Sequence, residues 1–149
     1  MSEWFNTLKA IVNRHDQQPE PETLARAAAV VLLELAAADD EQDESELAVI
    51  RQAIRHHFEL GEQAADELIE EAAHLRTRTV SLHRFTQDLR TGLPRQTRDD
   101  LVGWLWRVAW ADGRLDRHEE HLVRRVADLI GVPHDEFIRR KHQAAPDAP

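Results

Sequence analysis

A nine-residue pattern occurs twice in this chain, 73 residues apart, and constrains the fold more than any other feature of the sequence. The pattern reads Ala-Asp-x-x-x-Asp-x-x-Glu, first at residues 38–46 and again at residues 111–119. Each copy follows an alanine-rich apolar segment and precedes a segment with apolar residues at helical spacing. Two helix–acidic turn–helix units related by pseudo-twofold symmetry are the simplest fold that accounts for both copies.

Helical periodicity also covers the rest of the sequence, which predicts an all-α fold of about eight helices. Ser81, Pro94 and Asp116 are typical helix-start residues, whereas Gly61 and Gly131 are expected to end helices. The two segments with the broadest apolar faces, 22–38 and 94–111, should pack centrally. The first expected helix begins at Ser2 and the last follows Pro133. The others cover residues 22–38, 44–59, 62–74, 82–92, 94–111 and 116–130.

The length of 149 residues favours one domain. We expect an N-terminal helix and linker at residues 1–21, a helical domain at 22–142 and a flexible tail at 143–149. Because the chain has no cysteine, disulfides, thiolate metal sites and cysteine nucleophiles are excluded. No apolar stretch is long enough to span a membrane and no secretory signal is visible, so we expect a cytoplasmic protein without direct membrane insertion.

Charge is distributed unevenly along the chain. The formal net charge is −9, with −12 on residues 1–75 and +3 on residues 76–149. The overall negative charge argues against nucleic-acid binding, which needs a concentrated cationic surface. The asymmetry predicts a polarised surface that binds protein partners.

The second copy of the pattern carries a resemblance to a known family. The string Val108-Ala-Trp-Ala-Asp112-Gly-Arg-Leu-Asp116-Arg-His-Glu119 is similar to the A-x-A-D-G-x-[IL]-x-x-x-E pattern of the tellurite-resistance TerB-like family. The resemblance covers roughly residues 22–140, and it also links the chain to the central domain of the DjlA membrane co-chaperone. In the first copy Asp40 stands where the second has Gly113. The resemblance implies an all-helical domain and an association with tellurite resistance and chemical stress, without an agreed biochemical activity.

Part of each acidic turn has a structural explanation. Glu46 follows Asp43 by three residues, and Glu119 follows Asp116 by three. This is the spacing of a capping box, in which two side chains bind unpaired N–H groups at a helix start. Negative charge at that end of a helix also interacts favourably with the helix dipole. Capping alone therefore accounts for these four residues.

Asp39 and Asp112 need a different explanation, because each is expected near the C-terminal end of an apolar helix, where the dipole disfavours a carboxylate. Backbone N–H groups, an arginine or a cation would offset this. Three carboxylates in one turn supply the oxygen ligands that Ca²⁺ and Mg²⁺ prefer. Two interpretations stay open, capping alone or capping with weak divalent-cation binding. The candidate metal ligands are Asp39, Asp43 and Glu46 in the first turn and Asp112, Asp116 and Glu119 in the second.

Four histidines invite a metal interpretation that their spacing does not support. His118 and His121 are three residues apart, whereas the metalloprotease motif places two histidines four residues apart around a glutamate. We expect both on the surface. The pair His56–His57 is expected at the solvent side and edge of a helix.

The tryptophans and arginines also have two interpretations each. Trp104, Trp106 and Trp110 are expected in the core or between helices, with an exposed hydrophobic groove or a dimer interface as the alternative. The arginines of the middle third are expected on a solvated face, with docking of an acidic partner as the alternative. They are Arg76, Arg78, Arg84, Arg90, Arg95 and Arg98.

The sequence shows no nucleophile–base pairing and no glycine-rich phosphate loop. Together with the polarised charge, this predicts a non-enzymatic TerB-like interaction module of the cytoplasm, acting in tellurite or chemical-stress response. The expected partners are proteins, including membrane-associated ones, and a second copy of the chain. The alternative is a metal-dependent enzyme that uses the Asp/Glu turns to hold its metal.

Overall fold

The computed structural model describes residues 19–37, 44–78, 81–111 and 113–145, and in these ranges the chain forms seven α-helices and no strand. The all-α prediction is confirmed. The helix expected from Ser2 lies outside the described residues. None of the described helices has both the length and the apolar composition that crossing a membrane requires. The helices are α2 (Pro21–Ala37), α3 (Glu44–Phe58), α4 (Glu62–Arg78), α5 (His83–Gly92), α6 (Arg95–Trp110), α7 (Arg117–Leu129) and α8 (His134–Ala144).

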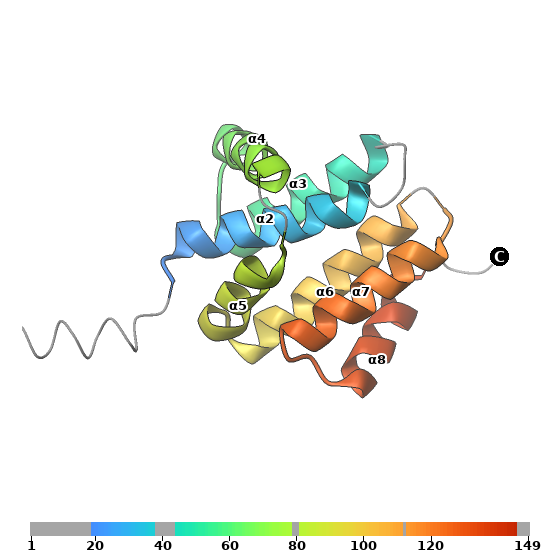
Figure 1. Ribbon diagram of the computed structural model, residues 1–149. Helices are drawn as coiled ribbons and strands as arrows, with labels where there is room; N and C mark the ends of the chain where they lie inside the picture. Colours follow the sequence, from blue (N-terminus) through green and yellow to red (C-terminus); the bar gives the residue numbers. More distant parts are fainter. Residues whose placement is uncertain (1–18, 38–43, 79–80, 112, 146–149) are drawn as a thin grey trace, which may run out of the picture.

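Helix boundaries repeat with the same offset as the acidic pattern. α2 ends at Ala37 and α6 at Trp110, while α3 begins at Glu44 and α7 at Arg117, so both boundaries are 73 residues apart. The correspondence extends to a third helix, because α4 packs on α2 as α8 packs on α6. Figure 1 shows α4 and α8 at opposite ends of the molecule, with α2 and α6 between them. Each repeat therefore contains three helices, one more than the acidic pattern alone predicts.

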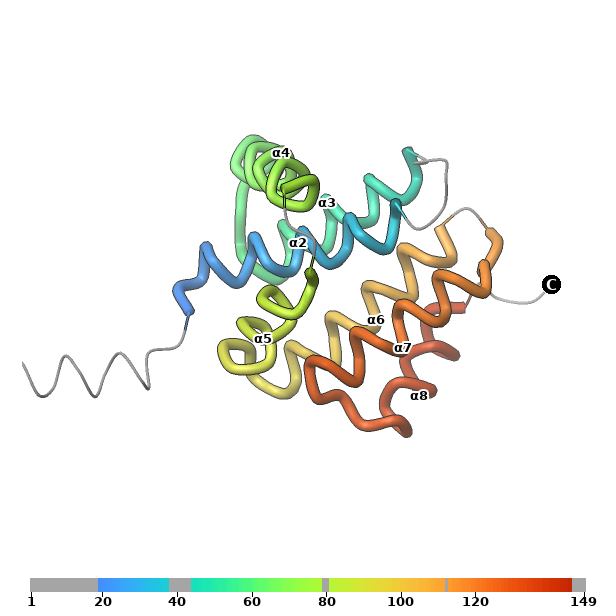
Figure 2. Tube along the Cα trace, in the orientation of Figure 1, coloured from blue at the N-terminus to red at the C-terminus, as the bar shows by residue number. Residues whose placement is uncertain are grey.

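The core is built around α2 and α6, as predicted. Eleven of the seventeen residues of α2 are buried. In α6 the fully buried Trp106 donates a hydrogen bond from Nε1 to the backbone carbonyl of Phe137 in α8, at 3.2 Å. α5 lies between the two units, where it contacts α2 of the first and α7 of the second (Figure 2). The broad apolar faces of α2 and α6 are buried because each of these two helices contacts helices of both units.

Local capping groups begin and end several helices where the sequence predicts. Ser81 Oγ accepts a hydrogen bond from the His83 N–H at the start of α5. Asp116 is the N-cap of α7 and its side chain accepts from the His118 N–H. Gly131 has a φ of +79°, and Val132 N–H bonds to the Ala127 carbonyl at 2.8 Å, which is the Schellman arrangement at a helix end.

The predicted role of Gly61 is wrong. α3 ends at Phe58, and the residue in the left-handed conformation is Glu59, with a φ of +52°. Gly61 instead belongs to the start of α4, since its carbonyl accepts the first helical hydrogen bond from Ala65 N–H at 2.9 Å. The turn between α3 and α4 is short. Glu59 already has the left-handed conformation that ends α3, so Gly61, two residues later, begins α4.

α4 is also longer than predicted, because it continues past His74 to Arg78. Leu75 packs against the core, and Arg76 forms an ion pair with Glu34 of α2 at 3.1 Å. These contacts with the core and with α2 hold the last turn of α4 in the helix. They depend on the partner helix, so the periodicity of α4 alone does not show them.

Candidate functional site

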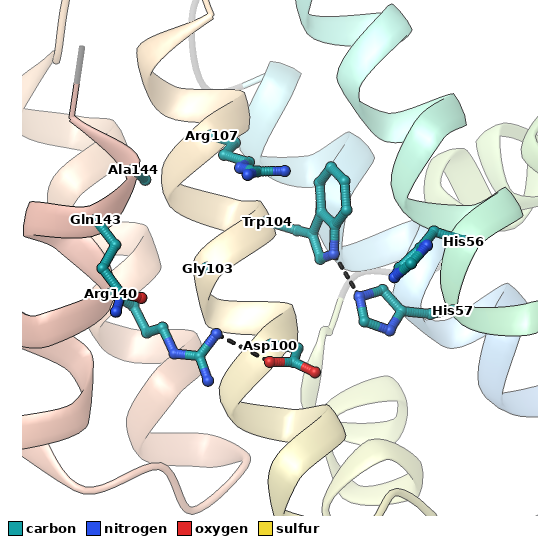
Figure 3. Close-up of a pocket in the computed structure, with 9 residues that line it drawn as sticks. All are labelled: His56, His57, Asp100, Gly103, Trp104, Arg107, Arg140, Gln143 and Ala144. Carbon is teal, nitrogen blue, oxygen red and sulfur yellow. Dashed lines mark hydrogen bonds and ion pairs between the residues drawn. The ribbon is translucent and has the colours of Figure 1, made fainter. Parts of the chain in front are cut away.

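A groove of about 230 Å³ lies between α3, α6 and α8. Figure 3 shows α6 along its floor, with α3 on one side and α8 on the other. Charged, aromatic and imidazole side chains converge on it from all three helices. The lining residues are His56, His57, Asp100, Gly103, Trp104, Arg107, Arg140, Gln143 and Ala144.

One face of α6 forms the floor. Asp100, Gly103, Trp104 and Arg107 are spaced at i, i+3, i+4 and i+7, which places them in one row along a helix. Gly103 is half-buried in the middle of this row. A Cβ added there would meet only Arg140, at 3.5 and 3.6 Å, which is ordinary van der Waals contact. Neither crowding nor an unusual backbone angle requires glycine at this position, although glycine destabilises a helix interior by about 0.5–1 kcal/mol.

The aromatic part of the groove is held by a contact across two helices. Trp104 is 8 % exposed, and its Nε1 donates a hydrogen bond to Nε2 of His57 in α3. The two rings meet edge to face, with centroids 5.8 Å apart. Because Nε2 accepts this hydrogen bond, His57 carries its proton on Nδ1 and is neutral. Burial lowers the pKa of His57, which favours the same neutral state; Asp100 opposes this effect and His56 adds to it.

Two arginines border the groove, and their charges are balanced differently. Arg140 donates to Asp100 and to Glu136, both at 2.9 Å. Its hydrogen bond lowers the pKa of the Glu136 carboxyl. Arg107 instead places its guanidinium over the Trp104 ring, 4.6 Å from the centroid, and no described carboxylate forms an ion pair with it.

The sequence did not predict this groove. The expectation that His56 and His57 lie at the solvent side and edge of a helix is confirmed for His56, which is exposed. His57 is instead half-buried and accepts the hydrogen bond from Trp104. Trp104 is buried as predicted, with its ring forming part of the groove. The available signal was a glycine within a helical row of charged and aromatic residues in α6.

The acidic turns are described only in part. Asp39, Asp43 and Asp112 lie outside the described residues. Glu46 and Glu119 occupy equivalent places in the first turns of α3 and α7, and each is 1 % exposed. Within the described ranges, no group of three or more carboxylate or imidazole side chains is arranged to hold a metal ion. The cation site therefore stays a prediction.

Asp116 has the capping role that the sequence predicts. Its Oδ1 accepts a hydrogen bond from the His118 N–H at 3.1 Å. His118 and His121 are both exposed on α7, as expected.

The arginines of the middle third do not all lie on a solvated face. Arg76 pairs with Glu34, and Arg98 donates to the Ile130 carbonyl at 2.8 Å, which stabilises the C-terminal end of α7. The exposed members are Arg78, Arg84, Arg90 and Arg95.

A second, wider groove of about 430 Å³ lies between α2, the end of α3 and α4. Its apolar lining includes Ala25, Phe58, Leu60, Ala64 and Leu68. Three carboxylates, those of Glu22, Glu67 and Glu71, border it. The groove therefore combines an apolar floor with an acidic rim.

Comparison with known proteins identifies one family. The sequence profile described as "Tellurite resistance protein TerB" matches residues 25–142, which is most of the chain. The match extends from the second turn of α2 into α8 and includes most of the residues that line the two grooves; Pro21, Glu22, Gln143 and Ala144 lie outside it. Among curated proteins and among solved structures, no significant match to the chain was found.

Proposed function

The chain belongs to the TerB family, and we propose that it is a non-enzymatic interaction module whose groove between α2 and α4 docks a basic, partly apolar segment of a partner protein. The observation that carries this proposal is the combination of apolar floor and acidic rim in one groove. An amphipathic helix binds such a groove by burying its apolar face while its charged residues meet the rim.

The floor offers apolar surface that the fold leaves partly uncovered. Phe58 and Leu60 are only half-buried, and Ala64 is exposed. All three lie where α3 passes into α4. Covering such side chains removes apolar area from water, which favours association by about 25 cal/mol per Å² before the costs of binding are subtracted.

The rim and the rest of α4 supply negative charge. Glu62, Asp66, Glu67, Glu70 and Glu71 are all exposed on this helix. Arg26 compensates part of this charge, because it pairs with Glu22 at 3.1 Å and with Glu71 at 3.2 Å. The carboxylates that remain select a basic partner and accelerate its association.

The family description gives the proposal its context. The description of the matched family refers to tellurite resistance. We therefore propose that this chain acts in tellurite or chemical-stress response. We place the module in the cytoplasm, with protein partners that include membrane-associated ones. The arginine-bearing half of a second copy competes for the same groove, which would make a homodimer.

Divalent-cation binding at the acidic turns is a second candidate function. The two turns offer carboxylate oxygens, which are the ligands that Ca²⁺ and Mg²⁺ prefer, and Glu46 and Glu119 lie at equivalent places in the two repeats. In this proposal the ion organises the turns and takes no part in a reaction.

Charge reversal on the groove rim tests the docking proposal. Glu67→Lys changes an exposed rim residue, and Asp128→Lys makes the same charge change at an exposed position on α7. Partner capture from the native host, followed by affinity measurement with the purified partner, should show binding to the wild type and to Asp128→Lys but at least tenfold weaker binding to Glu67→Lys. Cross-linking should map the partner's contact to a basic amphipathic segment.

Two outcomes would overturn the proposal. Equal affinity of both variants would place docking elsewhere on the molecule. Metal-dependent turnover in a hydrolase screen, abolished by Asp112→Asn, would replace the module by the alternative metal-dependent enzyme. A third outcome, self-association of the wild type that Glu67→Lys removes, would keep the groove as the docking site and identify the second copy as its occupant.

A further inference from the structure

We propose that the groove between α3, α6 and α8 binds a small carboxylate, with Arg107 as its cationic anchor. This site is separate from the α2–α4 groove and does not depend on what docks there. Four observations carry the proposal. They are the space left by Gly103, the Arg107 cation without an anionic partner among the described side chains, the charge balance at the opposite end of the groove, and the fixed aromatic wall.

Gly103 leaves room in the middle of the floor. A residue with a Cβ would fit the backbone and would meet Arg140 only at ordinary contact distances. Glycine is therefore unfavourable for the helix here, and packing does not compensate for it. In Figure 3 the stretch of α6 at Gly103 carries no side chain, and Arg107 and Asp100 lie on either side of it. A ligand lying over Gly103 would use this space.

Arg107 supplies a cation that has no anionic partner among the described side chains. Its guanidinium lies over the Trp104 ring, which keeps the group at the groove. A guanidinium binds a carboxylate through two parallel N–H···O hydrogen bonds. His56 is exposed, and its ring centroid lies 6.3 Å from that of Trp104, so it adds a further polar group to the groove.

The opposite end of the groove selects a single negative charge. There the charge of Arg140 is already shared by Asp100 and Glu136. The Asp100 carboxylate would repel a second negative charge on the ligand. One available cation and one nearby carboxylate therefore favour a monocarboxylate over a phosphate dianion.

Size and rigidity also favour a small ligand. The groove of about 230 Å³ is below the 300–1,000 Å³ typical of drug-sized ligand sites. The hydrogen bond to His57 fixes the Trp104 ring before a ligand arrives, so little side-chain entropy is lost on binding. The carboxylate would lie at Arg107, and the uncharged body of the ligand would cover Gly103 against Trp104.

Titration at constant ionic strength tests the site. Acetate, benzoate and inorganic phosphate are added to the full chain, and binding is followed by calorimetry and by the indole N–H resonance of Trp104, assigned with Trp104→Phe. We expect millimolar binding of a monocarboxylate, shifting that resonance, with phosphate at least tenfold weaker. A hexapeptide with a free C-terminal carboxylate is compared with the same peptide amidated at its C-terminus, to find whether the end of a peptide chain supplies the carboxylate. Binding of the free acid alone supports the same carboxylate site.

Matched variants separate recognition from stability. Arg107→Gln should weaken carboxylate binding at least tenfold, whereas Arg124→Gln, at an exposed position on α7, should leave it unchanged. Gly103→Ala should weaken binding modestly and Gly103→Leu strongly, and the unfolding midpoint of Gly103→Ala should equal or exceed that of the wild type. Absence of carboxylate binding at tens of millimolar, equal weakening by both arginine variants, or tighter binding of phosphate would overturn the proposal.

Discussion

Trp104 Nε1 donates a hydrogen bond to His57 Nε2, and this contact joins α6 to α3 across 47 residues of sequence. It makes a half-buried imidazole the acceptor for a buried indole. A protonated His57 has no lone pair on Nε2 and cannot accept this bond. The state of one proton therefore determines whether the two helices share the contact.

Acidification should destabilise the protein through His57. Burial lowers the pKa of this ring from its ordinary value of 6.5, so the unfolded chain binds the proton at a higher pH than the folded one. The neutral ring therefore makes its full contribution to the free energy of unfolding above about pH 6.5. This contribution is lost as the pH falls through the lowered pKa of the folded state. His57→Gln keeps an acceptor for Trp104 but does not titrate, so its melting temperature should fall less between pH 7.5 and pH 5 than that of the wild type. His118→Gln, at an exposed position, should retain the wild-type fall; equal falls in all three proteins would contradict the prediction.

Glu59→Gly should stabilise the protein by about 0.5–1 kcal/mol. Glu59 is exposed and has a φ of +52°, a conformation that costs a residue with a Cβ about 1–2 kcal/mol. Glycine avoids this cost, although its greater freedom in the unfolded chain offsets part of the gain. Urea unfolding measures the difference. Gly61→Ser is the control: it should be neutral or stabilising at the start of α4, and a loss of about 1 kcal/mol would instead restore Gly61 as the residue that ends α3.

Asp116→Ala should lower the free energy of unfolding by about 1 kcal/mol, as for other lost N-caps. The reason is the hydrogen bond that Asp116 Oδ1 accepts from the His118 N–H. Asp116→Asn retains an acceptor oxygen and should stay close to the wild type. Denaturant unfolding with and without millimolar Ca²⁺ should show the same loss in Asp116→Ala; a loss confined to the Ca²⁺ samples would indicate that Asp116 acts as a metal ligand and not as a cap.

Divalent cations should raise the melting temperature if the acidic turns bind them. A ligand at a hundredfold excess over its dissociation constant stabilises the folded state by about 2.7 kcal/mol. The rise with millimolar Ca²⁺ or Mg²⁺ should shrink in Asp39→Asn and in Asp112→Asn, while Asp128→Asn keeps it. Ionic strength is held constant, because screening alone stabilises so acidic a chain. No calorimetric heat and no change in melting would leave these carboxylates with a structural role only.

The sequence predicted those parts of the fold that depend on neighbouring residues. Ser81, Asp116 and Gly131 act at helix ends because a cap needs only the backbone a few residues away. Gly61 is the instructive failure. A glycine near a helix end is compatible with ending one helix or beginning the next, and the short turn between α3 and α4 decides which.

The candidate site depended on contacts that no local pattern contains. Arg140 bonds to Asp100 across 40 residues. The row Asp100, Gly103, Trp104 and Arg107 is visible in the sequence, but its meaning depends on which helices border it. The same row facing the core or open solvent would form no groove.

By itself, the sequence determined the all-α class, the 73-residue repeat and the family, because helical periodicity and capping are local properties of the chain. Only the tertiary structure decided that each repeat includes a third helix, that His57 accepts from Trp104 and that Arg107 borders a groove over Gly103. The physical reason is that the apolar stripe of a helix requires burial without specifying the partner. The side-chain packing between helices specifies it, and with it the polar groups that meet at their edges.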